Sequence, residues 1–160
     1  MNRTLTHIGL YIGVLLLAAC SESTAPDPVT YYQVFTGKTQ KAWIVTGITW
    51  TGDGQNDINY TLGSCGADDQ YIFYANADRH YQATNGARKC DPSEPDIWVD
   101  DSWSFVNATA SLTFIFPLLA DAPLPFFVRS VTDSKMELEI FIDQDNKYSY
   151  RIEFSAVDGK

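Results

Sequence analysis

The sequence has few basic residues, few cysteines and few histidines, and each shortage argues against a class of function. Lysine and arginine together number 11 in 160 residues, against 20 aspartates and glutamates, so the net charge is −9. Without a basic stripe to neutralise phosphates, a nucleic-acid-binding role is disfavoured. The three cysteines and two histidines do not provide the ligand set of a zinc site.

The sequence also lacks a constellation of catalytic residues. No Gly-x-Ser-x-Gly motif is present, so the usual serine nucleophile turn is missing. The acidic pairs Asp68-Asp69 and Asp100-Asp101 consist of adjacent residues, whose side chains diverge in a strand or a turn. Such pairs do not face each other across a substrate, as glycoside hydrolysis requires. The sequence therefore predicts neither an enzyme nor any catalytic residue.

A metal site is equally poorly supported. Asp53, Gln55 and Asp57 alternate as they do at the start of a calcium-binding loop. The sixth and twelfth positions of that loop need glycine and glutamate, but Ile58 and Ser64 occupy them here. We therefore predict no metal ligands and no cofactor.

The chain begins with an apolar run that is too short for a membrane span. Arg3 precedes residues 8–17, and Leu17-Ala18-Ala19-Cys20 closes the run, whereas a bilayer needs about 20 apolar residues. A positive start, a short apolar stretch and small residues are typical of a secretory signal. The last four residues resemble the [Leu/Val/Ile]-[Ala/Ser/Thr]-[Gly/Ala]-Cys pattern of bacterial lipoprotein processing. This resemblance implies cleavage before Cys20 and acylation of its thiol and amine; the alternative is an ordinary signal peptide with a chance cysteine.

The sequence thus divides into a lipoprotein signal peptide (1–19), a lipidated flexible tether (20–28) and one folded domain (29–158). Cleavage removes one arginine and no acidic residue, leaving a net charge of about −10. Since that charge does not attract an anionic lipid surface, the acyl chains on Cys20 must hold the protein at the membrane. We predict a location in the bacterial cell envelope. Ser21 follows Cys20, which favours the outer membrane and leaves open which face carries the domain.

Cysteine usage agrees with an exported protein. With Cys20 taken by lipid, Cys65 and Cys90 are the remaining pair, and exported chains reside where disulfides persist. We therefore predict a Cys65–Cys90 disulfide. In the chain-entropy model, closing this loop contributes about 3.5 kcal/mol to stability.

A short helix is predicted before the first strand. Asp27 and Pro28 have the residue types of an N-cap and of the first helical position, and Gly37 is a typical helix end. Tyr32 and Phe35 would then share one face of the helix. Two turns are too few to be stable without packing against the rest of the protein.

From residue 43 onwards the hydrophobic pattern has a period of two, which indicates strands. No helical pattern separates these segments, so we predict an all-β domain. The fold class is a single antiparallel up-and-down β-barrel of about eight strands, preceded by the short helix. A β-sandwich is the alternative. The predicted strands comprise residues 43–50, 71–75, 79–84, 98–106, 110–116, 126–131, 135–142 and 148–156.

Several motifs together resemble those of small bacterial lipocalin-like lipoproteins. These are Cys65-Gly-Ala-Asp-Asp-Gln-Tyr71-Ile-Phe73, then Cys90, then Trp103-Ser-Phe105, in the order in which that family shows Cys-x-x-Asp-Asp-x-Tyr-x-Phe, a second cysteine and Trp-x-Phe. The resemblance covers roughly residues 30 to 157. It implies a lipocalin-like barrel, an anchored location and a binding role, and it implies no catalytic residues.

The predicted function is binding of a small apolar or amphipathic ligand inside the barrel. Trp43, Tyr74, Tyr81 and Trp103 are the candidate ligand-contacting residues, because Tyr and Trp give a cavity an apolar wall with a few polar tips. For each of them the alternative is ordinary core packing. The alternative function is a filled-barrel scaffold that contacts an envelope protein or a glycan through its loops, residues 51–64 and 117–125.

Arg151 allows two interpretations. It could lie over Trp43 in a cation–π contact at the barrel base. It could instead pair across strands with Glu137 or Glu139.

Overall fold

The computed structural model describes residues 30–157. The predicted signal peptide, the predicted lipid attachment at Cys20 and the predicted tether of residues 20–28 lie outside this range. Within it, no helix is long and apolar enough to cross a membrane.

The N-terminal helix is shorter than predicted. Helix α2 (Tyr31–Thr36) begins after Thr30, whose side chain accepts a hydrogen bond from the Gln33 N–H while the Gln33 side chain accepts one from Thr30 N–H. This capping box satisfies two backbone donors at the helix start. Thr30 is extended, with φ −81° and ψ 153°, so the predicted start after Asp27 is wrong. Gly37 ends the helix as predicted, with φ 63°.

Ten strands and one short 3-10 helix follow α2. They are β1 (Gln40–Gly52), β2 (Ile58–Tyr60), β3 (Gln70–Tyr74), β4 (His80–Thr84), β5 (Ile97–Ser102), β6 (Ser104–Val106), η1 (Asn107–Thr109), β7 (Ser111–Ile115), β8 (Pro123–Val131), β9 (Lys135–Phe141) and β10 (Tyr148–Ala156). This confirms the predicted all-β class with one short helix in the N-terminal region.

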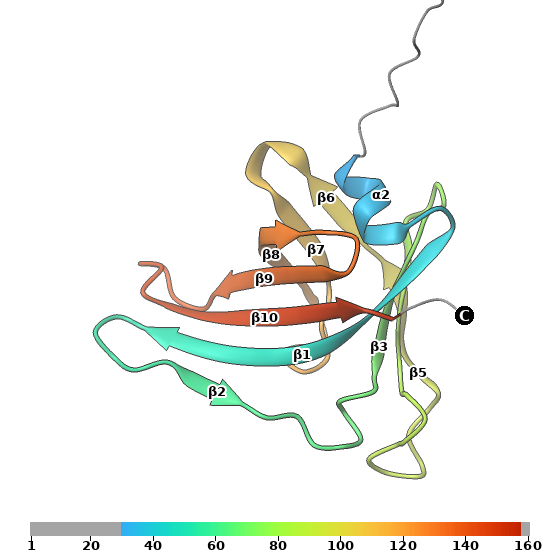
Figure 1. The fold of residues 1–160 in the computed structure, drawn as a ribbon, viewed down its shortest axis with the longest axis horizontal. Helices are drawn as coiled ribbons and strands as arrows, with labels where there is room; N and C mark the ends of the chain where they lie inside the picture. Colours follow the sequence, from blue (N-terminus) through green and yellow to red (C-terminus); the bar gives the residue numbers. More distant parts are fainter. Residues whose placement is uncertain (1–29, 158–160) are drawn as a thin grey trace, which may run out of the picture.

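The strands form a nearly closed antiparallel barrel (Figure 1). Nine of them follow the order β5-β4-β3-β1-β10-β9-β8-β7-β6, while β2 pairs separately with β1. Six of the eight neighbouring pairs in this order are also consecutive in the chain. The exceptions are β3 with β1, between which β2 lies in the sequence, and β10, which returns to pair with β1. The predicted up-and-down connectivity is confirmed, and the barrel is compatible with the lipocalin-like fold that the motifs implied.

A break at Trp103 brings the two ends of the sheet together. The segment predicted as one strand over 98–106 is two strands, because β5 pairs with β4 and β6 pairs with β7. Between them the Trp103 N–H donates to the Arg79 carbonyl, and the Trp103 indole is buried. The chain therefore crosses from one end of the sheet to the other at this residue.

Two other strands differ from the prediction. β2 lies within the predicted loop of residues 51–64, and its three residues pair with Ile48 to Trp50. β8 begins at Pro123 rather than after Pro125, although proline cannot donate to a sheet. β9 pairs with β8 only from Phe127 onwards, so both prolines lie where β8 has a single neighbour, β7.

The predicted disulfide is confirmed. Cys65 and Cys90 are bonded, with their Cα atoms 5.1 Å apart. The bond joins the segment before β3 to the one after β4. A second link lies beside it, where the Gly86 N–H donates to Asp69 Oδ1 at 3.2 Å.

Candidate ligand-binding site

The antiparallel order gives the barrel two ends with different connections. At one end, which we call the helix end, α2 lies with the short turns 75–79, 107–110 and 132–134. At the other end, the mouth end, lie residues 53–57, 61–69, 85–96, 116–122 and 142–147. The longer connections are therefore gathered at the mouth end.

The barrel interior is filled by aromatic side chains. They contact one another mainly edge to face: Phe114, for example, lies 5.3 Å from both Phe73 and Tyr81, measured between ring centroids. Such pairs add to the stability from burial alone. The buried aromatic residues are Phe35, Trp43, Tyr71, Phe73, Tyr81, Trp103, Phe114, Phe116, Phe126 and Phe154.

The four predicted ligand-contacting residues are placed in different surroundings. Trp43, Tyr81 and Trp103 are fully or almost fully buried. The Trp43 indole N–H donates to the Phe35 carbonyl at 3.0 Å, and the Tyr81 hydroxyl donates to the Ile115 carbonyl at 2.9 Å. Tyr74 faces away from this core: it stacks on His80 and its hydroxyl donates to Gln82 Oε1 at 2.8 Å. The four do not share one surface, and ligand contact by any of them stays a prediction.

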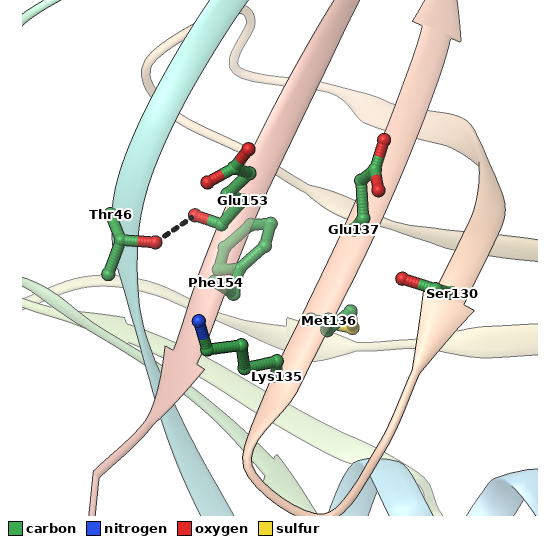
Figure 2. A pocket seen from close by; sticks show the side chains of 7 residues that line it. All are labelled: Thr46, Ser130, Lys135, Met136, Glu137, Glu153 and Phe154. Carbon is green, nitrogen blue, oxygen red and sulfur yellow. Dashed lines mark hydrogen bonds between the residues drawn. The ribbon is translucent and has the colours of Figure 1, made fainter.

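One pocket opens on the outside of the barrel wall (Figure 2). Its volume is about 210 Å³, and Glu137 and Glu153 project from the neighbouring strands β9 and β10. Thr46 on β1 donates to the Glu153 carbonyl at 3.3 Å. The remaining lining residues are Ser130, Lys135, Met136 and Phe154. This mostly polar pocket is small compared with ligand sites of about 300–1,000 Å³.

A second pocket lies at the mouth end and is apolar. Its volume is about 310 Å³. β1, β2 and β10 each contribute a lining residue, and the segment after β7 contributes Leu118 and Leu119. We call it the mouth pocket; its lining residues are Ile48, Tyr60, Thr61, Leu62, Leu118, Leu119 and Tyr150. An apolar hollow with a few polar groups at the end of a barrel is a typical place for a small ligand.

Aromatic residues continue the apolar face beyond the mouth pocket. Side chains two positions apart on a strand face the same way, so Trp50 continues the face of Ile48, and Tyr148 that of Tyr150. Trp50 and Tyr148 stack with centroids 5.7 Å apart and an 18° angle, and Tyr60 lies 6.2 Å from Tyr150. We call these four aromatic residues the aromatic ledge.

Gly52 makes room for the stacked pair of the ledge. A Cβ atom on this residue would lie 2.6 Å from Trp50 Cη2 and 3.0 Å from Tyr148 Cδ1. Both distances are too short for non-bonded carbon atoms. The indole therefore lies across the Gly52 backbone because that residue has no side chain.

The sequence predicted part of this site. Leu118 and Leu119 fall in the loop 117–125 that we proposed for contact, and Tyr60 to Leu62 fall in the loop 51–64. Ile48 and Tyr150 were assigned only to strands. Strand alternation put Ile48 and Trp50 on one face, but only the register of β1 with β2 and β10 shows that Tyr60 and Tyr150 face the same hollow.

An ion-pair cluster lies on the outer face of the barrel. Glu139 is only 2% exposed, and it accepts hydrogen bonds from Arg129, Ser149 and Arg151. Burial alone would raise the pKa of the Glu139 carboxyl, but these hydrogen bonds and the two arginine charges hold that pKa below its usual value. Of the two interpretations of Arg151, the structure therefore shows the ion pair with Glu139. The cation over the Trp43 ring is the amine of Lys41, which lies 5.2 Å from the ring centroid.

Asp69 is the other buried carboxylate. It is 3% exposed, and its Oδ2 has no hydrogen-bond partner among the described residues. Burial raises the pKa of Asp69, the Gly86 N–H opposes this, and the nearby Asp68 and Glu94 charges raise it further. Among residues 30–157 no three histidine, cysteine, aspartate or glutamate side chains are grouped so that they could hold a metal ion.

The chain was compared with protein families, curated proteins and solved structures, and nothing matches in any of the three. The assignment of the fold therefore rests on the strand order and register, and that of the site on its geometry.

Proposed function

We propose that this protein is a lipid-anchored binding protein that holds a small amphipathic ligand in the mouth pocket. The observation that supports the proposal is the pocket itself, an apolar hollow of about 310 Å³ at the end of a barrel whose interior is already filled. The ligand is therefore placed at the mouth rather than among the core aromatics. The contacts of the core side chains give no reason to assign a catalytic activity.

The anchor belongs to the same proposal and depends on the sequence alone. Cys20 closes the lipoprotein motif, so the acylated chain would be held in the cell envelope, with the outer membrane as the expected site. Cys20→Ser should release the protein into the soluble fraction and abolish incorporation of labelled palmitate. Label retained by this variant would contradict the anchor assignment.

Binding can be tested with the neutral apolar probe N-phenyl-1-naphthylamine and chain 21–160, which contains every described element. We expect saturable probe fluorescence with one site per chain. Leu118→Asp places a carboxylate in the pocket wall and should weaken binding at least about tenfold, since an unpaired charge is costly in an apolar site. Ala122→Asp, in the same segment and exposed, is the matched control and should bind as the parent does. Native mass spectrometry of the exported chain would detect a copurified ligand.

The alternative is a filled-barrel scaffold that contacts an envelope protein or a glycan through residues 51–64 and 117–125. The packed interior favours it over a ligand cavity inside the barrel. Absence of saturable binding across neutral, anionic and cationic apolar probes would reject the mouth pocket as a ligand site and support the scaffold.

A further inference from the structure

The charges of the chain are distributed unevenly between the two ends of the barrel. The mouth-end segments (53–57, 61–69, 85–96, 116–122 and 142–147) hold ten acidic and three basic residues. The helix end, from Thr30 to Thr39 and in the turns 75–79, 107–110 and 132–134, holds two of each. The mouth end is therefore strongly negative, while the helix end is neutral.

The segments beside the mouth pocket also hold more acidic than basic residues. Residues 53–57, 116–122 and 142–147 carry five aspartates, which are Asp53, Asp57, Asp121, Asp143 and Asp145, and a single lysine, Lys147. The end of β1 and the start of β10 lie side by side, since the Asp53 N–H donates to the Lys147 carbonyl at 3.0 Å. No lining residue of the mouth pocket is charged, so a ligand anion would find no basic partner inside it. A field of this sign repels anions and concentrates cations near the pocket.

The aromatic ledge reaches from the apolar pocket towards these aspartates, because Tyr60 and Tyr150 line the pocket and Trp50 and Tyr148 lie nearer to the ends of β1 and β10. Gly52, over which the indole of Trp50 lies, directly precedes Asp53. Faces of Trp and Tyr attract a cationic head group through their π-electrons, and they attract quaternary ammonium groups in particular. The order along the surface is then apolar wall, aromatic rings and carboxylates.

We propose that the ligand of the mouth pocket is a cationic amphiphile: an alkyl chain against Leu118, Leu119 and Ile48, with an ammonium head at the aromatic ledge and the aspartates beside it. This inference rests on the proposed function and narrows it. The arrangement disfavours a fatty acid, whose carboxylate would meet the negative mouth without a basic partner in the pocket lining.

The test compares three amphiphiles with the same chain: dodecyltrimethylammonium, dodecyl maltoside and dodecanoate, each below its critical micelle concentration. Affinities for chain 21–160 are measured by isothermal titration calorimetry. We expect the cation to bind at least about tenfold more tightly than the anion, with the neutral compound between them. Raising the salt from 50 to 500 mM should weaken binding of the cation, because salt screens exposed charges.

Two variants locate the charge effect. Asp53→Asn with Asp57→Asn should reduce affinity for the cation several-fold and leave the maltoside unchanged. Asp78→Asn with Asp133→Asn makes the same change in net charge at the helix end. This control should alter neither the affinity for the cation nor that for the maltoside. Tyr148→Leu keeps an apolar side chain but removes a ring, and should cost about three- to tenfold for the ammonium compound alone.

The outcomes separate this inference from the proposed function. Equal affinities for the three amphiphiles, or tightest binding of dodecanoate, would overturn the cationic preference and leave a ligand-binding mouth in place. An equal loss with both pairs of Asp→Asn substitutions would show a general charge effect and would also overturn it. If neither these amphiphiles nor N-phenyl-1-naphthylamine bind, both proposals are rejected.

Discussion

At the scale of single residues, Glu139 shows how a charge can be buried on the outer face of a barrel. Its carboxylate is enclosed by Arg129, Arg151 and Ser149, and the Ser149 hydroxyl donates to Oε1 at 2.7 Å. Both arginine side chains remain 48% exposed, so part of their charge is screened by water. The hydrogen bonds from Ser149 and Arg129 and the two arginine charges together offset the cost of burying this carboxylate.

Glu139→Gln should therefore destabilise the protein by about 1–2 kcal/mol at neutral pH. This lies in the lower part of the range for hydrogen bonds to charged groups, because both arginine partners are half exposed. The folded-state pKa of Glu139 is lowered, so its contribution is present above the unfolded-state pKa and is lost as pH falls through the folded-state pKa. Urea unfolding of the parent and of Glu139→Gln at pH 7 and pH 3 measures the loss of stability, which should be smaller at pH 3. Glu137→Gln, on the same strand and face, is the control; equal effects of the two substitutions would contradict the prediction.

Asp69 should have the opposite pH dependence. Its folded-state pKa is raised, so its stabilising contribution is present below the unfolded-state pKa and is lost as pH rises through the folded-state pKa. Asp69→Asn retains an acceptor for the Gly86 N–H and removes the charge. We expect the free energy of unfolding of Asp69→Asn, relative to that of the parent, to be higher at pH 7 than at pH 4. Asp57→Asn in an exposed loop is the control, and a difference that does not vary with pH would refute the assignment.

The sequence predicted only those contacts that do not require the strand register to be known. Cross-strand pairing of Arg151 with Glu137 or Glu139 followed from alternation alone. The choice of Glu139 did not, because it also needs Arg129, which lies at an irregularity between β8 and β9. Lys41 over Trp43 was missed because the strand begins at Gln40, three residues before its predicted start.

At the scale of elements, the segments on either side of the β3–β4 hairpin are held together at the mouth end. The Cys65–Cys90 disulfide and the hydrogen bond from the Gly86 N–H to Asp69 are the two links. Beside them the Gly86 backbone lies close to Asp68. A Cβ on Gly86 would lie 2.3 Å from the Asp68 carbonyl oxygen and 2.4 Å from Asp68 Cγ. The first of these atoms belongs to the backbone and cannot rotate away, so glycine is required there.

Gly86→Ala should cost about 2–3 kcal/mol of stability, within the range for overpacked sites. Gly63→Ala is the matched control, since its new Cβ would come no closer than 3.9 Å to another heavy atom, Cys65 Sγ, and its cost should stay within about 0.5 kcal/mol. Chemical denaturation of both variants with the disulfide intact gives the comparison. Similar costs for the two would show that the Asp68 contact is not what requires glycine.

The elements that the sequence predicted best were those with regular alternation. β9 and β10 were predicted to within one residue because apolar and polar side chains alternate along them. β2 was missed because three exposed residues carry no such pattern. The break at Trp103 was missed because both halves of that segment read as strand, and only their different partners separate them.

At the scale of the whole molecule, the described chain starts at the end of the barrel that lies opposite the mouth pocket. The described chain begins at Thr30, which caps α2 at the helix end, and the predicted tether of residues 20–28 precedes it. The acidic residues are concentrated at the mouth end. An anionic membrane surface attracts basic segments and repels acidic ones, so the charge distribution and the predicted attachment through Cys20 favour the same orientation.

We therefore predict that the lipidated protein directs its mouth away from the bilayer. A fluorophore at Asp78→Cys, in a turn at the helix end, should be quenched by nitroxide-labelled lipid headgroups more strongly than the same fluorophore at Ile58→Cys on β2. Vesicles containing anionic lipid should increase the difference, and high salt should reduce it by screening. The Cys20→Ser form of each labelled chain is the control and should show no quenching. Equal quenching at the two positions would mean that the tether imposes no preferred orientation, and stronger quenching at residue 58 would place the pocket at the membrane, where its ligand would come from the bilayer itself.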